Sequence, residues 1–317
     1  MYSRFVTVLL FFVADPLSSM PPQSAEALST KERAASRQRM NEKISRIQIA
    51  HLREAGALDV VRPVVIRAEN VRDASTSSGR GGGDDNTKTV HFQRHGQGYH
   101  NLLGEVYRDL GREIDIDDPD PDRNPFVKPE ILDSPLTELG RRESAARRAE
   151  ASLLSPELVI VSPLVRAVQT ACLSFADHGP PGNNGDEEND RGGSVPWVAH
   201  EGCREQLGLL TCNKRRPLSE TAADFPSINF DLVDSEDDVL WHPSIRERPL
   251  DESDRIYCFL VDFVRNRPEK EIAVVGHSAW LFNMCNAVVD CGGDESLTSW
   301  FSTSEIRSMS LSFSDRK

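Results

Sequence analysis

The sequence alternates short apolar runs with segments of helical periodicity, and this alternation limits the folds open to the chain. Leu158–Val161 and residues 272–275 are continuous apolar runs, as expected of parallel strands buried on both faces. Between them, apolar residues at helical spacing extend from 251 to 267 and stop at Pro268. Strands that alternate with helices predict an α/β fold, a three-layer sandwich with a mainly parallel sheet flanked by helices.

The same patterns predict the remaining elements of this sandwich. Further strands are expected at 89–92 and 195–199, and a weak alternation at 306–313 predicts an edge strand. Helices are expected at 136–154, with Thr137 as N-cap, at 162–175, starting with Ser162 as cap and Pro163 in the first turn, and at 280–289.

Composition divides the chain of 317 residues into three predicted parts. Residues 74–86 are small, polar and glycine-rich, so they cannot bury enough surface to order themselves and are interpreted as a linker. A basic helical segment with this linker is expected at 31–86, and a catalytic domain at 87–317. Two further polar patches, 114–124 and 178–194, are predicted to be loops within that domain.

The first part, 1–30, resembles a signal or targeting segment. Arg4 precedes an apolar run at 5–14, which is too short to span a bilayer but suits the apolar region of a signal peptide. Ala25-Glu26-Ala27 offers a cleavage site of small residues. Two interpretations stay open: a presequence for the secretory route or an organelle, and a frayed tail that contains an apolar stretch. No other segment predicts a membrane span.

Charge and cysteine content exclude several functions. The formal net charge of -13 argues against nucleic acid as a partner, because binding a phosphate backbone needs a basic face. A local arginine cluster can still bind a small anion in an acidic protein. The six cysteines show no CxxC pair and no spacing with histidine that suits zinc. They are interpreted as buried thiols in preference to a disulfide framework.

Polar residues with phosphoryl-transfer chemistry follow the predicted strands. Ligands of such sheets bind beyond the carboxyl ends of the strands, and the residues found there are Arg94 and His95, Ser162 and Arg166, Arg204 and Glu205, and His277. A neutral imidazole can carry a phosphoryl group, and arginine forks match its charged oxygens. A carboxyl group can protonate the leaving oxygen and then activate water. The residue types therefore predict a phosphoryl-transfer site.

The motifs at these positions resemble those of the histidine phosphatase superfamily, the phosphoglycerate-mutase-like proteins. Arg94-His95-Gly96 is similar to the RHG signature, with Asn101 where RHGxxxxN has its asparagine. Residues 162–170 resemble SxLxRAxQT, residues 136–140 the LTxxG helix start, and residues 274–278 the module with the second histidine. The form RHGQGYHN looks closest to a branch of plants and fungi. The resemblance covers about residues 89 to 313.

The resemblance implies a role for each candidate residue. His95 would be the nucleophile, and His277 the second catalytic histidine. Arg94 and Arg166 would bind the phosphoryl group. Glu205 would be the catalytic acid, with Glu201 as the alternative. Phosphate-binding roles are also expected for Asn101, Arg215 and Arg216. The competing interpretation is a turn asparagine for Asn101 and a solvated face for the two arginines.

These assignments predict a metal-independent phosphomonoesterase that acts on a small phosphorylated metabolite through a phosphohistidine intermediate. No cofactor and no metal is expected, because the sequence has no carboxylate cluster at ligand spacing. Two rivals stay open: phosphotransfer of the mutase type, and a non-catalytic protein that binds phosphorylated ligands or serves as a scaffold. Family resemblance suggests a cytoplasmic catalytic domain, while the signal-like N-terminus suggests the secretory route or an organelle.

Overall fold

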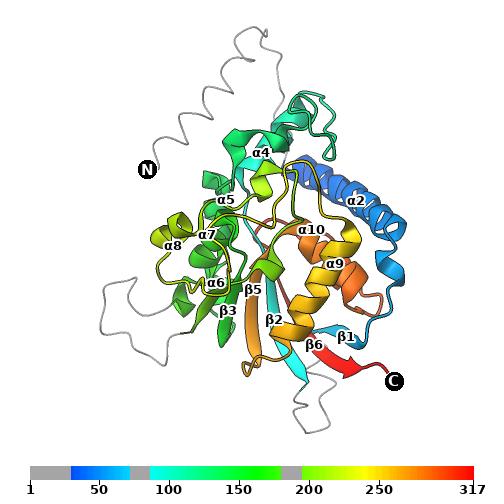
Figure 1. Ribbon diagram of the computed structural model, residues 1–317, viewed down its shortest axis with the longest axis vertical. Coiled ribbons are helices and arrows are strands. Elements are labelled where there is room, and N and C mark those ends of the chain that lie inside the picture. The colour runs from blue at the N-terminus through cyan, green and yellow to red at the C-terminus, as the bar shows by residue number, and fades with distance from the viewer. Residues whose placement is uncertain (1–29, 72–85, 180–194) are drawn as a thin grey trace. The chain divides into compact units, whose positions relative to one another are not determined.

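The structure is a computed structural model and describes residues 30–71, 86–179 and 195–317 (Figure 1). It divides into two compact units, residues 1–44 and 45–317, and the division falls within the helix α2, Thr30–Glu54. The second unit contains all six strands of the sheet. The predicted targeting segment up to residue 29, nearly all of the linker 74–86 and most of the loop 178–194 lie outside the described residues.

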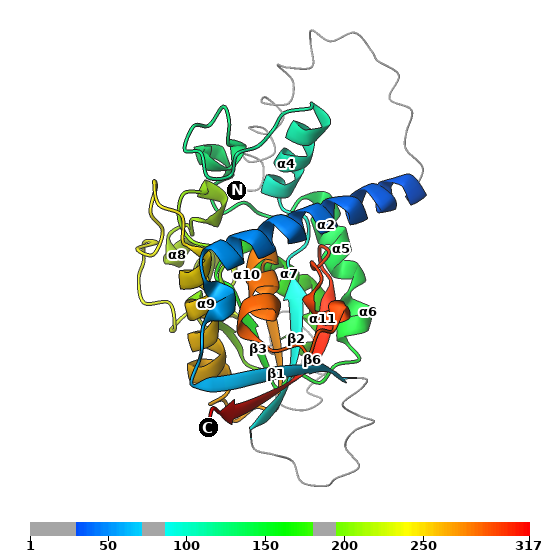
Figure 2. The same cartoon turned by 90° about the vertical axis from the view of Figure 1, so that its right-hand side faces the viewer.

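A six-stranded sheet in the order β1-β6-β2-β5-β3-β4 forms the centre of this unit (Figures 1 and 2). The strands are β1 Val64–Asn70, β2 Thr87–Arg94, β3 Leu158–Val161, β4 Trp197–Ala199, β5 Glu271–Gly276 and β6 Ile306–Asp315. Pairing is parallel from β2 through β5 and β3 to β4, whereas β6 is antiparallel to both of its neighbours. Among the described strands β6 alone runs against the others, so the mainly parallel sheet is confirmed.

Successive residues of the central strands bury their side chains on opposite faces of the sheet. Leu158 and Ile160 of β3 pack with α9, Pro249–Cys258, and α10, Ser278–Asn283. Val159 and Val161 pack instead with α7, Val165–Ser174, on the other face. A strand exposes alternate side chains to its two faces, so a continuous apolar run requires cover on both. The three-layer sandwich is therefore confirmed (Figure 1).

The remaining helices largely follow the expected pattern. They are α4 Tyr99–Asp109, α5 Glu138–Ala146, α6 Arg148–Ala151, α8 Leu218–Asp224 and α11 Glu295–Thr298, and π-helical turns at Phe259–Val264 and Met284–Val288 extend α9 and α10. The helix predicted at 136–154 is thus divided at Arg147. Thr137 is confirmed as N-cap, because its hydroxyl oxygen accepts from the Gly140 N–H at 3.1 Å.

Two sequence predictions were wrong in a way that bears on the site. Ser162 does not cap α7, whose N-cap is Leu164; the carboxylate of Asp133 instead accepts from the first helical N–H, that of Val165, at 2.9 Å. Ser162 is thereby free to bind a histidine. Residues 306–313 belong to an inner strand, because β1 pairs along the outer side of β6.

The strand β1 was not predicted from the sequence, and it covers an otherwise open sheet edge. Val64, Ile66 and Ala68 are buried in the main hydrophobic core together with residues of β6. Leu52 of α2 is also fully buried, next to Phe282. Residues 45–70 therefore belong to the same compact unit as the sheet, which extends this unit beyond the predicted start at 87. The division into three functional parts stays a prediction.

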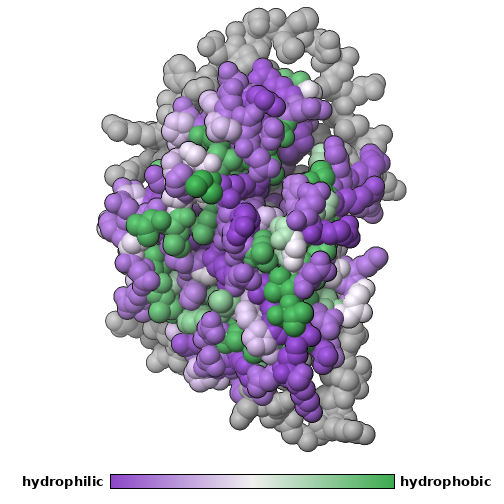
Figure 3. Space-filling model, turned by 45° about the vertical axis from the view of Figure 1, so that its right-hand side comes forward, coloured by the Kyte–Doolittle hydropathy of each residue, from purple (hydrophilic) through white to green (hydrophobic). Residues whose placement is uncertain are grey.

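No helix in the described ranges combines the length and apolar character needed to cross a membrane. The face in Figure 3 is mostly hydrophilic, with hydrophobic residues in small groups. All six cysteines are free thiols, and four of them are buried.

Truncation tests the contribution of β1 and the end of α2. A fragment of residues 45–317 should unfold like the full chain, whereas residues 87–317 should lose more than about 3 kcal/mol of unfolding free energy, since each buried Val or Ile side chain contributes about 1.5–3 kcal/mol. Urea unfolding followed by circular dichroism measures both fragments. Equal stability of the two fragments would show that β1 is dispensable, in agreement with the boundary predicted from composition.

Candidate active site

The carboxyl ends of the parallel strands bring the predicted residues to one edge of the sheet. Arg94, the last residue of β2, pairs with Gly276, the last of β5, and the next backbone N–H, that of His95, donates to the Gly276 carbonyl at 3.0 Å. Val161, which ends β3, is opposite Val275 of β5. The parallel strands therefore end at the same edge of the sheet, and the residues that follow β2 and β5, His95 and His277, lie side by side there.

His95 is 1% exposed and its ring is held in one tautomer. Nδ1 lies 2.6 Å from the carbonyl oxygen of Gly96. A carbonyl oxygen only accepts hydrogen bonds, so Nδ1 carries the proton and Nε2 keeps its lone pair. Burial, followed by the positive charges of Arg166 and Arg94, holds the pKa of His95 well below its usual value. The side chain is therefore neutral at pH 7, with Nε2 available as a nucleophile.

His277 lies directly against His95, with ring centroids 5.1 Å apart. Its Nε2 is 2.7 Å from the hydroxyl oxygen of Ser162, whereas its Nδ1 is buried and has no hydrogen-bond partner among the described residues. Ser162 also accepts from the Leu164 N–H at 3.4 Å. Burial, then the charge of Arg166, lowers the pKa of His277 well below its usual value. Its Nδ1 is thus able to form a hydrogen bond with a bound ligand.

Arg166 is fully buried and Arg94 is partly buried, and neither guanidinium group has a carboxylate partner. Arg94 donates to the Phe301 carbonyl at 2.7 Å, and Arg166 donates to the Cys212 carbonyl at 2.6 Å and the Asn213 side chain at 2.9 Å. Neither forms an ion pair within the described part of the chain, and both have a buried, unpartnered Nε. Burial lowers the pKa of Arg94 to about 10, while the negative charges of Glu205, Glu143 and Glu305 oppose this shift.

Other arginines of the same region, fully or largely buried, are neutralised by carboxylates. Arg204 binds Asp238 through both terminal nitrogens at 2.9 and 2.6 Å, and Arg255 binds Glu247 at 2.9 and 2.7 Å. A buried charge without a partner costs several kcal/mol. The pair Arg94 and Arg166 therefore defines a place where an anion would be strongly stabilised.

Glu205 and Glu201, the two candidate acids, have different surroundings. Glu205 accepts hydrogen bonds from the first turn of α10, which follows His277: from the Ser278 hydroxyl at 3.3 Å and from the next two backbone N–H groups at 3.3 and 3.1 Å. Glu201 is engaged by Arg204 at 2.8 Å and Arg215 at 3.3 Å. Of the two, Glu205 is bound to the helix turn that directly follows His277.

The other predicted phosphate ligands have partners of their own. Arg215 donates to the backbone carbonyls of residues 235–237 at 2.8 to 3.1 Å, and Arg216 binds Thr221 at 2.9 Å and Asp224 at 2.7 Å. The structure thus gives both arginines local structural contacts away from the histidines. Asn101 accepts from the Gly98 N–H at 2.9 Å and so caps α4.

A third histidine in the cluster was missed by the sequence analysis. His100, in the first turn of α4, has its ring centroid 5.5 Å from that of His95. Its Nδ1 is buried without a partner among the described residues, and burial, then Arg166, lowers its pKa well below the usual value. The position of His100 in the motif could have revealed this role. Helix α4 begins four residues after His95, so the side chains of its first turn can still lie next to His95.

Close packing of two motif segments fixes the loop that carries His95. A Cβ at Gly140 would lie 2.1 Å from the Gln97 carbonyl oxygen, so a side chain has no room there. Thr137 donates to the Gln97 side-chain oxygen at 2.7 Å, and its N–H donates to the Gln97 carbonyl at 2.9 Å. The LTxxG segment is therefore a support for the loop after β2, which explains its threonine and glycine.

Comparisons with known proteins show the family to which the chain belongs. A family model described as the histidine phosphatase superfamily (branch 1) matches residues 130–302. A phosphoglycerate mutase-like protein of Arabidopsis thaliana is 34% identical over 244 residues, covering 70% of this chain and 83% of that protein. The chain belongs to the histidine phosphatase superfamily. Phosphoglycerate mutase-like protein 1 of the same plant is 32% identical over 242 residues, covering 70% of this chain and 80% of its own.

The segment matched by the family model contains Arg166, Glu205 and His277, whereas Arg94 and His95 precede it. Among solved structures, a mycobacterial glucosyl-3-phosphoglycerate phosphatase is similar, with 16% identity and a TM-score of 0.38, over 72% of this chain and 97% of that one. The assignment to the narrower RHGQGYHN branch stays a prediction. The described residues contain no group of three or more His, Cys, Asp or Glu side chains that could hold a metal ion.

Proposed function

We propose that the protein hydrolyses a small phosphomonoester and that His95 carries the phosphoryl group between the two half-reactions. The observation that supports this most is the pair of guanidinium groups of Arg94 and Arg166, which form no ion pair with a carboxylate and lie near a neutral imidazole with a free Nε2. A phosphoryl group supplies the missing negative charge. During transfer the negative charge spreads over the phosphoryl oxygens, and paired arginine donors stabilise this charge.

In the proposed first step, Nε2 of His95 attacks phosphorus and the bond to the leaving oxygen breaks. The carbonyl of Gly96 holds the opposite nitrogen, so the ring cannot turn away. The Ser162 hydroxyl oxygen accepts from the Leu164 N–H, and its proton can then be donated to Nε2 of His277. The other ring nitrogen, Nδ1, would carry the proton of His277 and donate it to a phosphoryl oxygen. Arg94, Arg166 and His277 together would supply the positive charge and donors for which other phosphatases use a metal.

Glu205 is the proposed acid and base. It would protonate the leaving oxygen in the first step and take a proton from the attacking water in the second. Its support is its place at the start of α10, beside His277, whereas two arginines hold Glu201. Asn101 keeps a proposed secondary role in phosphate binding, because its side-chain nitrogen has no hydrogen bond within the described residues.

His100 adds a third imidazole to the proposed phosphate site. Its Nδ1 edge faces Gly98, where a Cβ would lie 2.7 Å from both Nδ1 and Cε1. The opposite nitrogen, Nε2, forms no hydrogen bond with the described residues, and the ring touches His95. We therefore assign Nε2 of His100 as a further donor to the phosphoryl group.

Loss of the nucleophile should abolish turnover without unfolding the protein. His95→Ala is expected to lower kcat by more than about three decades on p-nitrophenyl phosphate. The parent should be equally active with and without EDTA, and rapid quenching should trap an acid-labile, alkali-stable phosphoenzyme. His178→Ala, away from the cluster, is the control. Activity of His95→Ala within tenfold of the parent, or a phosphoserine in its place, would refute the assignment.

The role of Glu205 predicts a difference between two substrate classes. Glu205→Gln should lower hydrolysis of an alkyl phosphate by about two to four decades, because an alkoxide needs a proton to leave. Phosphorylation of His95 by p-nitrophenyl phosphate should be affected far less, and phosphoenzyme should accumulate in quenched samples. Glu201→Gln is the matched control. If Glu201→Gln shows the difference and Glu205→Gln does not, the acid is Glu201.

Two unlike substitutions should remove the His100 donor in the same way. His100→Leu deletes it, and Gly98→Ala should displace the ring, although the backbone angles of Gly98, φ -89° and ψ 165°, suit alanine. Both should weaken inhibition by orthovanadate by about tenfold or more, the loss expected for a hydrogen bond to a charged group. His100→Gln, which retains a donor, should recover most of the affinity. Unchanged inhibition in a folded His100→Leu variant would exclude the contact.

A further inference from the structure

Asn213 is a buried amide, 4% exposed, with two unlike partners. The Arg166 guanidinium donates to its Oδ1 at 2.9 Å, and its Nδ2 donates to the carbonyl of Gln206 at 2.9 Å. A guanidinium only donates hydrogen bonds and a backbone carbonyl only accepts them, so the amide is restricted to this orientation. Asparagine thus satisfies both partners at once, which neither an aspartate nor an apolar side chain can do.

The contact of Asn213 with Gln206 continues to the proposed acid. The N–H of Gln206 donates to the Glu205 carboxylate at 3.2 Å. One chain of hydrogen bonds therefore extends from the guanidinium expected to bind phosphate to the carboxylate expected to protonate the leaving oxygen. The Asn213 side chain is the central member of this chain.

At one end of the chain, Arg166 depends on residues 212 and 213 for its orientation. Among the described residues, its guanidinium donates only to the Cys212 carbonyl, at 2.6 Å, and to Oδ1 of Asn213. Both acceptors are neutral, so they orient the guanidinium without cancelling its charge. The amide in this place therefore leaves the positive charge of Arg166 for an anion.

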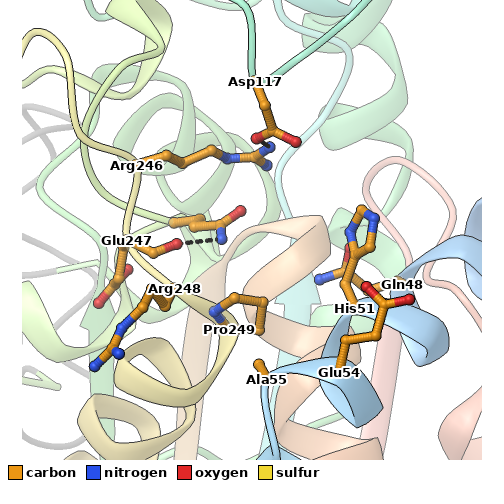
Figure 4. Close-up of a pocket in the computed structure, with 10 residues that line it drawn as sticks. Gln48, His51, Glu54, Ala55, Asp117, Arg246, Glu247, Arg248 and Pro249 are labelled. Atoms are coloured by element: carbon orange, nitrogen blue, oxygen red, sulfur yellow. Dashed lines mark hydrogen bonds and ion pairs between the residues drawn. The ribbon is translucent and has the colours of Figure 1, made fainter.

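At the other end, the segment that follows Glu205 has two anchors. The first is Glu247: its carbonyl accepts from the Gln206 side chain at 2.6 Å, in the wall of a cavity of about 480 Å³ (Figure 4), and its carboxylate accepts from the Leu207 N–H at 2.9 Å. The second is Asn213, which binds the Gln206 carbonyl. Removing the amide would release the backbone directly after the acid.

The loop that joins these two segments is held in one shape. Gly208 has φ +75°, and a Cβ there would lie 1.9 Å from the Ile245 carbonyl oxygen. The Leu209 N–H donates to the His242 carbonyl at 2.7 Å. The loop therefore keeps Asn213 in place, and placement matters because an error of about 1 Å in a catalytic group can cost about 100-fold in rate.

We infer that Asn213 is a positioning residue that sets the distance between the phosphate-binding Arg166 and the acid Glu205. The inference rests on the proposed function. Asn213 itself would touch no reacting atom and would act through the two groups that it holds. Its loss should therefore impair both anion binding and protonation of the leaving group.

The test measures both effects on full-length Asn213→Ala protein. Inhibition by orthovanadate should weaken about tenfold or more, the loss expected for a hydrogen bond to a charged group. The ratio of kcat/KM for ethyl phosphate to that for p-nitrophenyl phosphate should also fall about tenfold or more, because the alkoxide needs the acid and the aryl group does not. A residue that only stabilises the fold would change neither quantity.

A double-mutant comparison shows whether the second effect depends on Glu205. In a Glu205→Gln background the acid is already lost, so Asn213→Ala should no longer lower the substrate ratio. The weaker inhibition by orthovanadate should persist in this background, because it depends on Arg166.

Asn124→Ala is the matched control. Asn124 is also a fully buried asparagine that bridges two groups: it accepts from the Phe126 N–H at 3.1 Å and donates to the Asp118 carbonyl at 2.9 Å. Its loss should lower the free energy of unfolding and leave both measurements unchanged. If Asn213→Ala does not fold, Asn213→Ser takes its place, because the shorter hydroxyl group cannot reach both partners.

An unchanged substrate ratio in the folded variant, or a fall that persists in the Glu205→Gln background, would overturn the inference while leaving the phosphatase intact. Unchanged inhibition by orthovanadate would overturn it equally. Absence of turnover of both substrates by the parent protein would overturn the proposed function, and this inference with it.

Discussion

Register between parallel strands is the constraint on which the site depends. Because β2 and β5 end at paired residues, Arg94 and Gly276, the histidines that follow them start from adjacent positions, joined by the His95 N–H to Gly276 carbonyl bond at 3.0 Å. A shift of one residue would turn every side chain of a strand to the opposite face. Burial of the apolar runs on both faces of the sheet opposes such a shift, so the packing of the core also holds the imidazoles together.

The charges around the histidines determine which ligand this geometry can bind. Most buried positive charges of the second unit are neutralised, as Arg204 is by Asp238 and Arg255 by Glu247. Arg94 and Arg166 are left without a carboxylate, and their charges help to keep His95 neutral. Within the described residues, this contrast marks Arg94 and Arg166 as a candidate place for an anion. An acidic chain can in this way build a strongly positive pocket.

Sequence patterns predicted the fold class and most of the inner strands, because those strands are covered on both faces and read as continuous apolar runs. Leu158–Val161 was predicted with its observed bounds. The motifs likewise placed His95, Arg166 and His277 in the segments that follow the strands. Contacts between distant segments were not predictable: β1 is stabilised by pairing with β6 near the other end of the chain, and Asp133, not Ser162, caps α7.

The sequence by itself determined the layered α/β fold and the residue types of the candidate site, because periodicity and short motifs are local properties of a chain. Only the tertiary structure decided which neighbour each polar group has. It held Glu201 between Arg204 and Arg215, left Glu205 beside His277, gave Arg215 and Arg216 local partners, and brought His100 to His95. The reason is physical: the charge state and freedom of a buried side chain depend on groups that lie close in space, wherever they stand in the sequence.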